Sequence, residues 1–530
     1  MNLFLSKDIE VAPASLSELF MQQLRAHLPT VAKVLSEYGD KTVSEYLQWV
    51  CSYCSDTAQP VGDLADVITD YATPLLGPAL ARQAAVDIVS CPVALTTNHH
   101  GVDYFAQSVQ GTLLFSLRQA QGPLLKTVPV FACGNIPLDN MTYPRGGLLY
   151  GAPGRSDQLT RVPLFSNKVR RQPVARVRGL DQTMLQQAFK RLAKQQQNSE
   201  VYPASADTLN ELLLQEYAAV DVLQLDNYSD QSVVLNNRIW QRLFTDDVVA
   251  PQLIYLELEK IAERLLSIDL NNPQSLVSIL LFNGPLRDLL IARLDSVSGC
   301  WNNTELQQRW TGRNTPSGGA STGCGTFMFW GVDDKGRRIP LAMVADSDGY
   351  LLRGCDDNGV VREVQLTAQA LLCELQAGRI MPSVFTCFLV IALARGVTCA
   401  GGYYQAEYLP LMQQGVSEVL ASQTATRAMA KLVEEVFTDR YMSGMQAVMS
   451  ATGSGLIPAG PVEIISGGAL NSEELQRITR LTLADAHRAS LAETMPDALH
   501  ELLPQGDWQQ VLAAENDQLL KDKVVIRQLY

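Results

Sequence analysis

The sequence predicts an α/β protein whose core is an open parallel sheet, accompanied by large helical segments and a small antiparallel β-meander. The first observation concerns two β-type runs, AVDIVSCPVALTT at 85–97 and TVPVFACGN at 127–135, which enclose a helical pattern from Gln107 to Ala120. Strand, helix, strand is the order that builds a parallel sheet. Each run leads into a polar loop, and such loops form the ligand crevice of open α/β sheets.

Two further observations predict the helices and the meander. Apolar residues recur at three- and four-residue spacing through 16–90 and again through much of 180–300, which is typical of amphipathic helices. Between 326 and 366 the turn sequences DDKG, DSDG and DDNG separate short alternating stretches, a pattern that favours consecutive β-hairpins.

We therefore divide the chain into six regions. In chain order these are an N-terminal helical region, 1–84; a first α/β half of the core, 85–180; a helical region, 181–310; a β-meander insertion, 311–366; a second α/β half of the core, 367–480; and a C-terminal helical tail, 481–530.

The composition and charge of the chain indicate which kinds of partner and compartment to expect. Hydrophobic residues make up 47% of the 530 residues, enough for a large core, and the formal net charge of -13 argues against nucleic acid or an anionic membrane as the main partner. The longest apolar run, at 384–394, is too short to span a bilayer. The start MNLFLSKDIEVAPASL does not read as a signal peptide, and the ten cysteines fit thiols in a reducing compartment. We expect a cytoplasmic protein.

The first polar loop reads TNHHGVDY and contains two of the five histidines. Imidazole changes its charge near neutral pH and therefore serves as a general base or acid. Neighbouring residues on an extended loop point in different directions, so at most one of His99 and His100 faces a substrate. We predict that His100 is the base and that Asp103 holds its tautomer, as the third member of a catalytic triad does. Three flanking residues complete the predicted substrate site: Thr97, Asn98 and Gln107.

Two alternatives remain for this loop. In the first, His99, His100 and Asp103 hold a divalent ion in a metal-dependent hydrolase, although the other histidines, at 27, 487 and 500, lie in helical patterns elsewhere. In the second, both histidines satisfy only backbone groups of the loop. A metal is not our first expectation.

The second polar loop, CGNIPLDNMTYPRGG at 133–147, combines a carboxylate with an arginine. This combination suits recognition of an amino acid or a phosphate, whereas the alternative is an ordinary loop with Asx turns. The predicted substrate-binding residues are Asn135, Asp139, Asn140 and Arg145. A basic cluster follows, suited to an anionic substrate or to a solvated face: Lys168, Arg170, Arg171, Arg176 and Arg178.

The third segment, ARGVTCAGGYYQAEYLP at 394–410, follows the longest apolar run. Its glycine pair allows a ligand to approach the backbone closely. Its tyrosines either contact this ligand or pack against other aromatic side chains. The predicted substrate-binding residues are Arg395, Gln405, Glu407 and Tyr408.

The order of these three segments resembles the bacillithiol synthase family. In that family a strand ends in a TGQQ-type loop, a VPVFW strand precedes a loop with acidic residues and histidine, and a later strand ends in a GGPGE-type turn before a tyrosine. Here the segments read TTNHHGVDYFAQSVQGTLLF, VPVFACGNIPLDN and CAGGYYQAEYLPLMQ, with Tyr408 at the spacing of the family's tyrosine. His99 and His100 replace the glutamine pair, the second loop lacks the histidine, and Gln405 replaces a glutamate. The resemblance implies a Rossmann-like core and C–N bond formation between small polar substrates.

We therefore expect a bacterial biosynthetic enzyme, a ligase or transferase that forms an amide or other C–N bond on an amino acid or amine. His100 would take a proton from the attacking amine. A hypothesis of a different kind is a non-catalytic binding or scaffold protein that uses the helices between 180 and 300.

The cofactor is unknown from the sequence. The glycine-rich GGASTGCGT lacks the lysine of a P-loop, and ATP or another nucleotide stays open. The expected partner is a small amino-acid or amine substrate, with a homodimer as an option and with neither nucleic acid nor a membrane.

Overall fold

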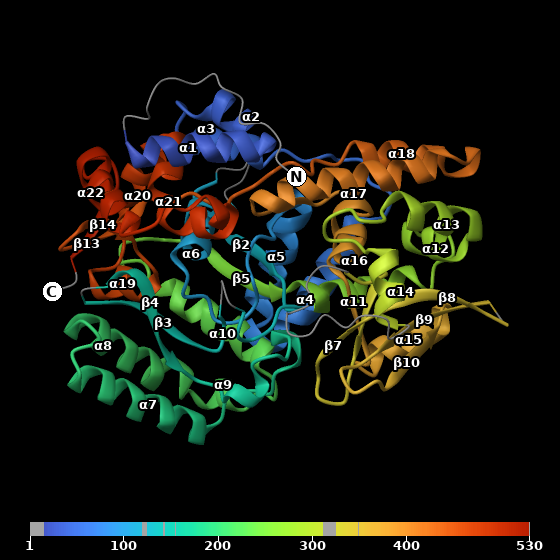
Figure 1. Ribbon diagram of the computed structural model, residues 1–530, viewed down its shortest axis with the longest axis horizontal. Helices are drawn as coiled ribbons and strands as arrows, with labels where there is room; N and C mark the ends of the chain where they lie inside the picture. The colour runs from blue at the N-terminus through green and yellow to red at the C-terminus, as the bar shows by residue number, and fades with distance from the viewer. Residues whose placement is uncertain are drawn as a thin grey trace.

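A parallel sheet of four strands lies at the centre of the computed structural model, which describes residues 15–118, 125–140, 144–153, 155–310, 325–347 and 349–528 (Figure 1). The spatial order of the strands is β5-β2-β1-β12, and every neighbouring pair is parallel. The strands are β1 (Val93–Leu95), β2 (Thr127–Ala132), β5 (Gln252–Glu257) and β12 (Thr398–Ala400). The predicted α/β class with a parallel sheet is confirmed.

Helices bury both faces of this sheet, as parallel sheets require. Successive side chains of a strand point to opposite faces, so Ala94 and Phe131 join one hydrophobic core while Leu95 and Val130 join another. The first core includes α4 (Val61–Leu76), α5 (Pro78–Ser90) and α11 (Leu258–Asp269). The second includes α6 (Ala106–Ser116) and the N-terminal and C-terminal helices.

The predicted strand–helix–strand unit is present as β1, α6 and β2, but its first strand is shorter than expected. Residues 85–90 of the β-type run 85–97 belong to α5. Pro78 opens this helix, and Ala81, Ala84 and Ile88 bury one face of it at helical spacing. Residues 119–120 of the predicted helix lie outside the described residues.

The expected helical region 181–310 contains β5, an edge strand of the central sheet. QLIYLE at 252–257 is almost wholly buried, so it lacks the alternation that reveals a half-exposed strand. Its apolar residues run directly into the helical spacing of α11, and a short apolar run before a helix cannot be assigned by periodicity alone. The expectation of helix over 252–257 was therefore wrong.

The two ends of the described chain pack together (Figure 1). Glu515 accepts hydrogen bonds from the backbone N–H groups of Leu16 and Ser17, both at 2.8 Å. The N-terminal helices are α1 (Leu16–His27), α2 (Pro29–Tyr38) and α3 (Val43–Val50); the C-terminal helices are α20 (Ser472–Arg480), α21 (Leu483–Ala498) and α22 (Trp508–Leu520). A small mixed sheet, β14-β13-β15, completes this end: β13 (Val448–Thr452), β14 (Gly455–Pro458) and β15 (Val525–Gln528).

A third hydrophobic core lies under a hairpin and a group of helices at the lower left of Figure 1. The hairpin consists of β3 (Gly147–Ala152) and β4 (Arg155–Pro163). The helices are α7 (Gln182–Gln197), α8 (Pro203–Glu211), the π-helix η3 (Leu212–Tyr217), α9 (Val220–Leu223) and α10 (Tyr228–Gln241), with the short 3₁₀ turns η1 (Asn167–Val169) and η2 (Val174–Arg176) nearby.

The predicted meander forms two small antiparallel sheets, β10-β9-β8 and β11-β6-β7. DDKG lies between β6 and β7, and DDNG lies between β9 and β10, as expected for hairpin turns. Residue 348 of DSDG and residues 311–324 of the predicted insertion lie outside the described residues. The strands are β6 (Phe329–Val332), β7 (Arg338–Pro340), β8 (Ala342–Asp346), β9 (Gly349–Cys355), β10 (Val361–Gln365) and β11 (Ile380–Pro382).

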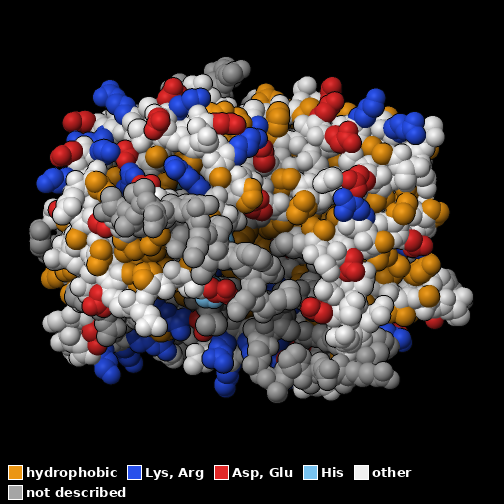
Figure 2. Space-filling model, turned by 45° about the horizontal axis from the view of Figure 1, so that its top comes forward, with side chains coloured by type: hydrophobic (Ala, Val, Ile, Leu, Met, Phe, Trp, Pro, Cys, Tyr) orange, Lys and Arg blue, Asp and Glu red, His pale blue; other side chains and the backbone are white. Residues whose placement is uncertain are grey.

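The longest apolar run, 384–394, is helical and forms α16 (Val384–Phe388) followed by the π-helix η4 (Leu389–Leu393). In the described part of the chain no helix combines the length and apolarity needed to cross a membrane. Charges of both signs are interspersed over the face in Figure 2. The remaining helices are α12 (Leu276–Phe282), α13 (Gly284–Arg293), α14 (Asn303–Trp310), α15 (Ala368–Gln376), α17 (Tyr403–Ala421), η5 (Thr424–Thr426), α18 (Arg427–Glu434), α19 (Pro461–Ser466) and η6 (His500–Leu502).

Arg395, which follows η4, connects its own segment to α4 and α11 inside the first core. The prediction that Arg395 binds substrate was therefore wrong. Its side chain is fully buried, and its guanidinium donates to Asp63 of α4 at 2.7 Å and to Asp269 of α11 at 2.9 and 3.1 Å. A guanidinium so enclosed by two carboxylates has no donors to offer a ligand. Removing it would leave the buried carboxylate of Asp269 and the partly buried carboxylate of Asp63 without their cation.

We therefore predict that Arg395→Ala lowers the free energy of unfolding by about 3–5 kcal/mol, the usual cost of breaking a buried ion pair. The matched control is Arg293→Ala, because Arg293 pairs with Glu418 while both side chains are nearly half exposed; that change should cost about 0–1 kcal/mol. Urea unfolding followed by circular dichroism measures both. Equal losses in the two variants would contradict this assignment.

Candidate functional site

The carboxyl ends of the parallel strands meet at one edge of the sheet. β1 and β12 are neighbours, yet the chain leaves β1 towards β2 on its other side, so the strand order reverses between β1 and β12. In open α/β sheets such a reversal opens a crevice beyond the strand ends, and ligands bind there. The loops after β1, β2 and β12 are the three segments in which the sequence predicts site residues.

A cleft of about 320 Å³ lies at this edge, and residues of all three segments line it. They are joined by residues of α11, α16, α21 and the segment before β13. The lining residues are Thr96, Thr97, His99, Gln107, Ser108, Cys133, Ile136, Arg145, Leu258, Val384, Phe388, Gly402, Tyr403, Tyr404, Gln405, Tyr408, Ser443 and Asp497. Segments some 300 residues apart in the chain therefore share one cavity.

His99 is the histidine of the pair that lines the cleft. It forms an isolated parallel bridge with Cys133, and its carbonyl accepts a hydrogen bond from the Tyr255 hydroxyl at 2.8 Å. Burial and the nearby charge of Arg145 lower the pKa of His99 to about 4. Its imidazole is therefore neutral at pH 7 and can accept a hydrogen bond or a proton.

His100, predicted as the base, does not line the cleft. Its Nε2 lies 2.9 Å from the Ser229 hydroxyl and 3.1 Å from the Ser229 carbonyl, and its ring stacks on Tyr255 with centroids 5.8 Å apart. Burial lowers the pKa of His100 to about 3. Neighbouring side chains do diverge as expected, but the roles are reversed: His100 packs inward and His99 faces the cavity.

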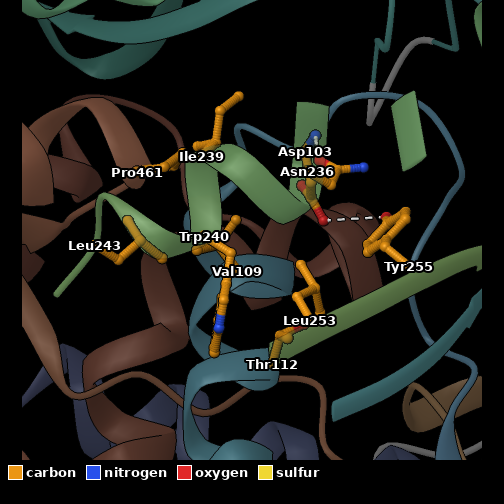
Figure 3. A pocket seen from close by; sticks show the side chains of 10 residues that line it. All are labelled: Asp103, Val109, Thr112, Asn236, Ile239, Trp240, Leu243, Leu253, Tyr255 and Pro461. Atoms are coloured by element: carbon orange, nitrogen blue, oxygen red, sulfur yellow. Dashed lines mark hydrogen bonds between the residues drawn. The ribbon is translucent and has the colours of Figure 1, made fainter. Parts of the chain in front are cut away.

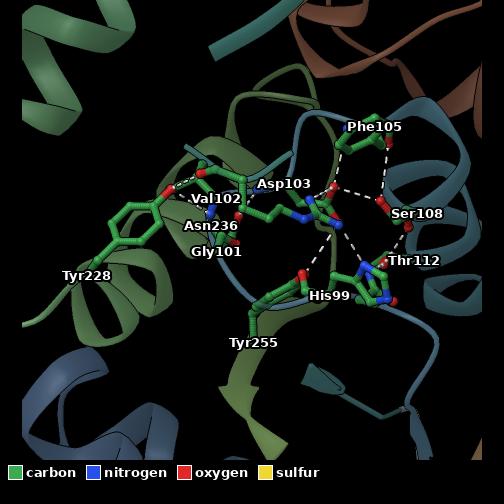
Figure 4. A network of polar contacts seen from close by, with 12 residues as sticks. His99, Gly101, Val102, Asp103, Phe105, Ser108, Thr112, Tyr228, Asn236 and Tyr255 are labelled. Carbon is green, nitrogen blue, oxygen red and sulfur yellow. Dashed lines mark hydrogen bonds and ion pairs between the residues drawn. The ribbon is translucent and has the colours of Figure 1, made fainter. Parts of the chain in front are cut away.

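Asp103 pairs with Arg145 and not with an imidazole. The two charges are 2.5 Å apart, and both side chains are at least 95% buried. Asp103 also accepts from Ser108 at 2.6 Å, from Asn98 at 3.2 Å and from its own loop's Phe105 N–H at 3.2 Å. Figure 4 shows this network, in which Asn236 of α10 accepts the Asp103 N–H at 2.9 Å and the Tyr255 hydroxyl of β5 donates to the Asp103 carboxylate at 3.4 Å. The predicted tautomer-holding role of Asp103 was therefore wrong; the residue anchors the histidine loop.

A second cavity, of about 20 Å³, lies behind this network between α6, α10 and β5 (Figure 3). Asp103, Thr112, Asn236 and Tyr255 give it a polar side, and the rest of its wall is apolar. It has room for roughly one water molecule. This size rules it out as the substrate site.

The other predicted residues of the first loop divide between the cleft and its support. Thr97 and Gln107 line the cleft, and Gln107 donates to the Ser443 hydroxyl at 2.7 Å. Asn98 is buried below the surface of the cleft, where it donates to Asp103 and to Thr112 at 3.3 Å.

Of the second loop, only Arg145 among the predicted residues lines the cleft, together with Cys133 and Ile136. The Asn135 carbonyl accepts from Arg338 at 2.6 Å, and Asp139 pairs with Arg161 at 2.6 Å. The Asn140 N–H closes a turn on the Pro137 carbonyl at 3.1 Å. Residues 141–143 of this loop lie outside the described residues.

The basic cluster predicted after this loop is not part of the cleft wall. Its members are Lys168, Arg170, Arg171 and Arg178, which are exposed, and Arg176, which is half-buried.

In the third segment, Gln405 and Tyr408 line the cleft from the first turns of α17. Gln405 donates to Thr96 at 2.7 Å and so ties the end of β12 to the end of β1. Glu407 points away from the cleft and accepts the Thr30 N–H of α2 at 2.8 Å. Its predicted substrate contact is replaced by this tie between α17 and α2.

Two helices begin at the cleft wall. α6 and α17 present Gln107 and Tyr403–Gln405 from their first turns, and neither has a side-chain hydrogen bond at its N-cap. The N–H groups of a first helical turn carry partial positive charge and favour an anionic group. At α6 the Gln107 N–H already contacts the Glu493 carboxylate and the Phe105 N–H contacts Asp103. The start of α17 is therefore the part of the wall that can stabilise a bound carboxylate.

Sequence reasoning missed several residues of the wall. Cys133 donates its thiol hydrogen to the Glu259 carboxylate at 3.2 Å. Glu259 lies in the first turn of α11, which directly follows β5. Because β5 was taken for helix, no site residue was expected after it. Phe388, Ser443 and Asp497 come from segments with no polar loop signal, and only their packing brings them to the cleft.

The alternative metal site of His99, His100 and Asp103 does not form in the described structure. His100 and Asp103 point to Ser229 and Arg145 instead of towards His99. Nowhere in the described ranges do three or more His, Cys, Asp and Glu side chains gather as metal ligands would.

Comparison of the chain with models of protein families, with curated proteins and with solved structures finds no match.

We predict that the imidazole of His99 stays neutral down to about pH 4, because burial and Arg145 both oppose its protonation. The measurement is an NMR titration of histidine side chains from pH 8 to 4, with His99→Gln used for assignment. Exposed His500 provides an internal comparison in the same spectra. A His99 signal that titrates near its ordinary value of about 6.5 would contradict this description of the cleft.

Proposed function

We propose that the protein is a small-molecule biosynthetic enzyme, a ligase or transferase that forms an amide or other C–N bond on an amino acid or amine. The observation that carries this proposal is the cleft at the reversal of strand order, where the three loops meet. The order β5-β2-β1-β12 corresponds to the first four strands, 3-2-1-4, of a Rossmann fold. We therefore also propose a Rossmann-like core.

The lining of the cleft suits an amino acid. The first turn of α17 would receive its carboxylate, and Asp497 brings a carboxylate to the wall for an ammonium group. Tyr403, Tyr404 and Tyr408 add aromatic faces, which attract cations. Hydroxyl and amide groups of the wall provide the remaining hydrogen bonds.

His99 is the proposed proton acceptor. It faces the cavity and is neutral at pH 7, so it can take a proton from an attacking amine. This activity agrees with the one that the resemblance to the bacillithiol synthase family implies, and that relationship stays a proposal. Neither the metal-dependent hydrolase nor the scaffold hypothesis gains an observation in its favour.

Binding in the cleft is tested by thermal shift with amino acids, amines, amino sugars and nucleotides. A ligand at 100 times its dissociation constant stabilises the fold by about 2.7 kcal/mol. Thr97→Trp places an indole in the cleft and should abolish the thermal shift caused by the ligand. The control is Val249→Trp, at a position that is 99% exposed, and this variant should keep the thermal shift. A shift that survives Thr97→Trp would show that the ligand binds elsewhere.

Once a ligand is found, we predict that His99→Ala lowers turnover by about 10²–10⁴-fold, the range for a general acid–base group. The ligand's thermal shift should persist, because the N-terminus of α17 and the tyrosines remain. His500→Ala, at an exposed position, is the control and should retain full activity. Product formation is followed by mass spectrometry. Undiminished turnover in folded His99→Ala protein would remove this role.

A further inference from the structure

Cys133 has three properties that no other cysteine in the described chain combines. It lies at the cleft wall, it follows directly from β2 of the central sheet, and its thiol contacts a carboxylate. The parallel bridge between His99 and Cys133 places these residues side by side, and bridge partners in parallel strands direct their side chains to the same side. The thiol and the imidazole therefore lie on the same side of this bridge at the cleft wall, and the thiol contacts the carboxylate of Glu259.

The carboxylate is held in a fixed position. Glu259 accepts the backbone N–H groups of Gly134 at 2.7 Å and Asn135 at 3.1 Å, in addition to the thiol of Cys133. Its side chain is fully enclosed, with the residue only 1% exposed. Burial and the neighbouring Glu257 raise the pKa of Glu259 to about 7, which is the range in which a general base works best at neutral pH.

The loop that bears the thiol is also held from the opposite side. Arg338 of β7 donates to the carbonyl and to the side-chain oxygen of Asn135, at 2.6 and 3.1 Å. The backbone of Cys133 itself is fixed by hydrogen bonds with Asn98 and His100, at 2.9 and 2.8 Å. The position of the thiol relative to the cavity is thus set before any ligand arrives, which favours catalysis.

From this geometry we infer that Cys133 is a nucleophile that carries an acyl group as a thioester before the acyl group passes to an amine. This inference rests on the proposed C–N bond-forming function and names its covalent step. The resting thiol is protonated, because burial raises its pKa well above the ordinary value. It needs a base at the moment of attack, and Glu259 is 3.2 Å away.

Acyl transfer through Cys133 takes two steps. Sγ of Cys133 attacks the carbonyl carbon of an activated acyl donor, a thioester or ester; the S–C bond forms, the bond to the leaving group breaks, and the thiol proton passes through Glu259 to the leaving group. The amine nitrogen then attacks the thioester; the N–C bond forms and the S–C bond breaks. The amine proton is taken by His99 and returned to the departing thiolate. The net products are an amide and the released leaving group.

The first experiment uses the full chain with p-nitrophenyl acetate as the acyl donor. We expect a burst of roughly one equivalent of p-nitrophenol, as for a covalent acyl-enzyme, and one acetyl group on the peptide that contains Cys133. Cys133→Ala should abolish the burst. Cys373→Ser, on an exposed position of α15, is the matched control and should keep it.

Glu259→Gln tests the base while leaving the thiol in place. The amide oxygen of glutamine can still accept a backbone N–H, so the loop keeps part of its support. Acetylation of Cys133 should slow by about 10²-fold. Melting temperatures of all variants verify folding, and Cys133→Ser replaces Cys133→Ala if the latter is unstable. Acetyl groups found only on other residues, or an unchanged burst in a folded Cys133 variant, would overturn the inference.

A second measurement separates this inference from the proposed function. Acetylated enzyme is mixed with the amino acid or amine that raised the melting temperature, and N-acetyl product is sought by mass spectrometry. Product from the wild type but equally from Cys133→Ala would preserve the function and refute the thioester. A Cys133 thioester that no amine or amino acid discharges would support the nucleophile and refute C–N bond formation.

Discussion

The four parallel strands of the central sheet determine where the cleft and the loops that line it lie. Parallel pairing puts the ends of β1, β2, β5 and β12 at one edge of the sheet, and the order β5-β2-β1-β12 separates the loops on either side of β1. The cleft exists because the chain leaves β1 in one direction and β12 is added on the other. An antiparallel β12 would place its glycine pair and tyrosines at the opposite edge.

The buried pair of Asp103 and Arg145 makes the floor of this cleft rigid. An ion pair taken out of water gains little net stability, because desolvation offsets most of the attraction. Its value here is geometric: Asp103 also accepts hydrogen bonds from Ser108, Asn98 and the Phe105 N–H, so one carboxylate holds several parts of the loop after β1 in place. Within that arrangement His100 is directed to Ser229 and His99 to the cavity.

Burial also sets the chemistry of the wall. It keeps the imidazole of His99 and the thiol of Cys133 uncharged, while it makes the carboxyl of Glu259 a stronger base than a solvated one. Glu259 arrives with α11 just after β5. The same enclosure that depresses the basicity of the histidine therefore makes the glutamate the more effective proton acceptor for the thiol.

Most of the architecture follows from local pattern. Apolar spacing of three and four residues predicts the N-terminal helices, the DDKG and DDNG turns predict hairpins, and the β-type runs before two polar loops predict β1 and β2. β5 was missed, because a strand buried on both faces has no alternation to distinguish it from the helix that follows. Residues 384–394 were similarly ambiguous and are helical.

The amino-acid sequence by itself determined the α/β class and the three loops that line the cleft, because strand ends and polar loops are local signals. It did not determine which side chain of a loop faces the cavity. The side chains of His100, Glu407 and Arg395 each contact a partner at least 120 residues away in the chain, which are Ser229, Thr30 and Asp63, and the Asp103 side chain pairs with Arg145 of the next loop. Only the packed structure decides such contacts, because buried polar groups must find donors and acceptors wherever the fold brings them.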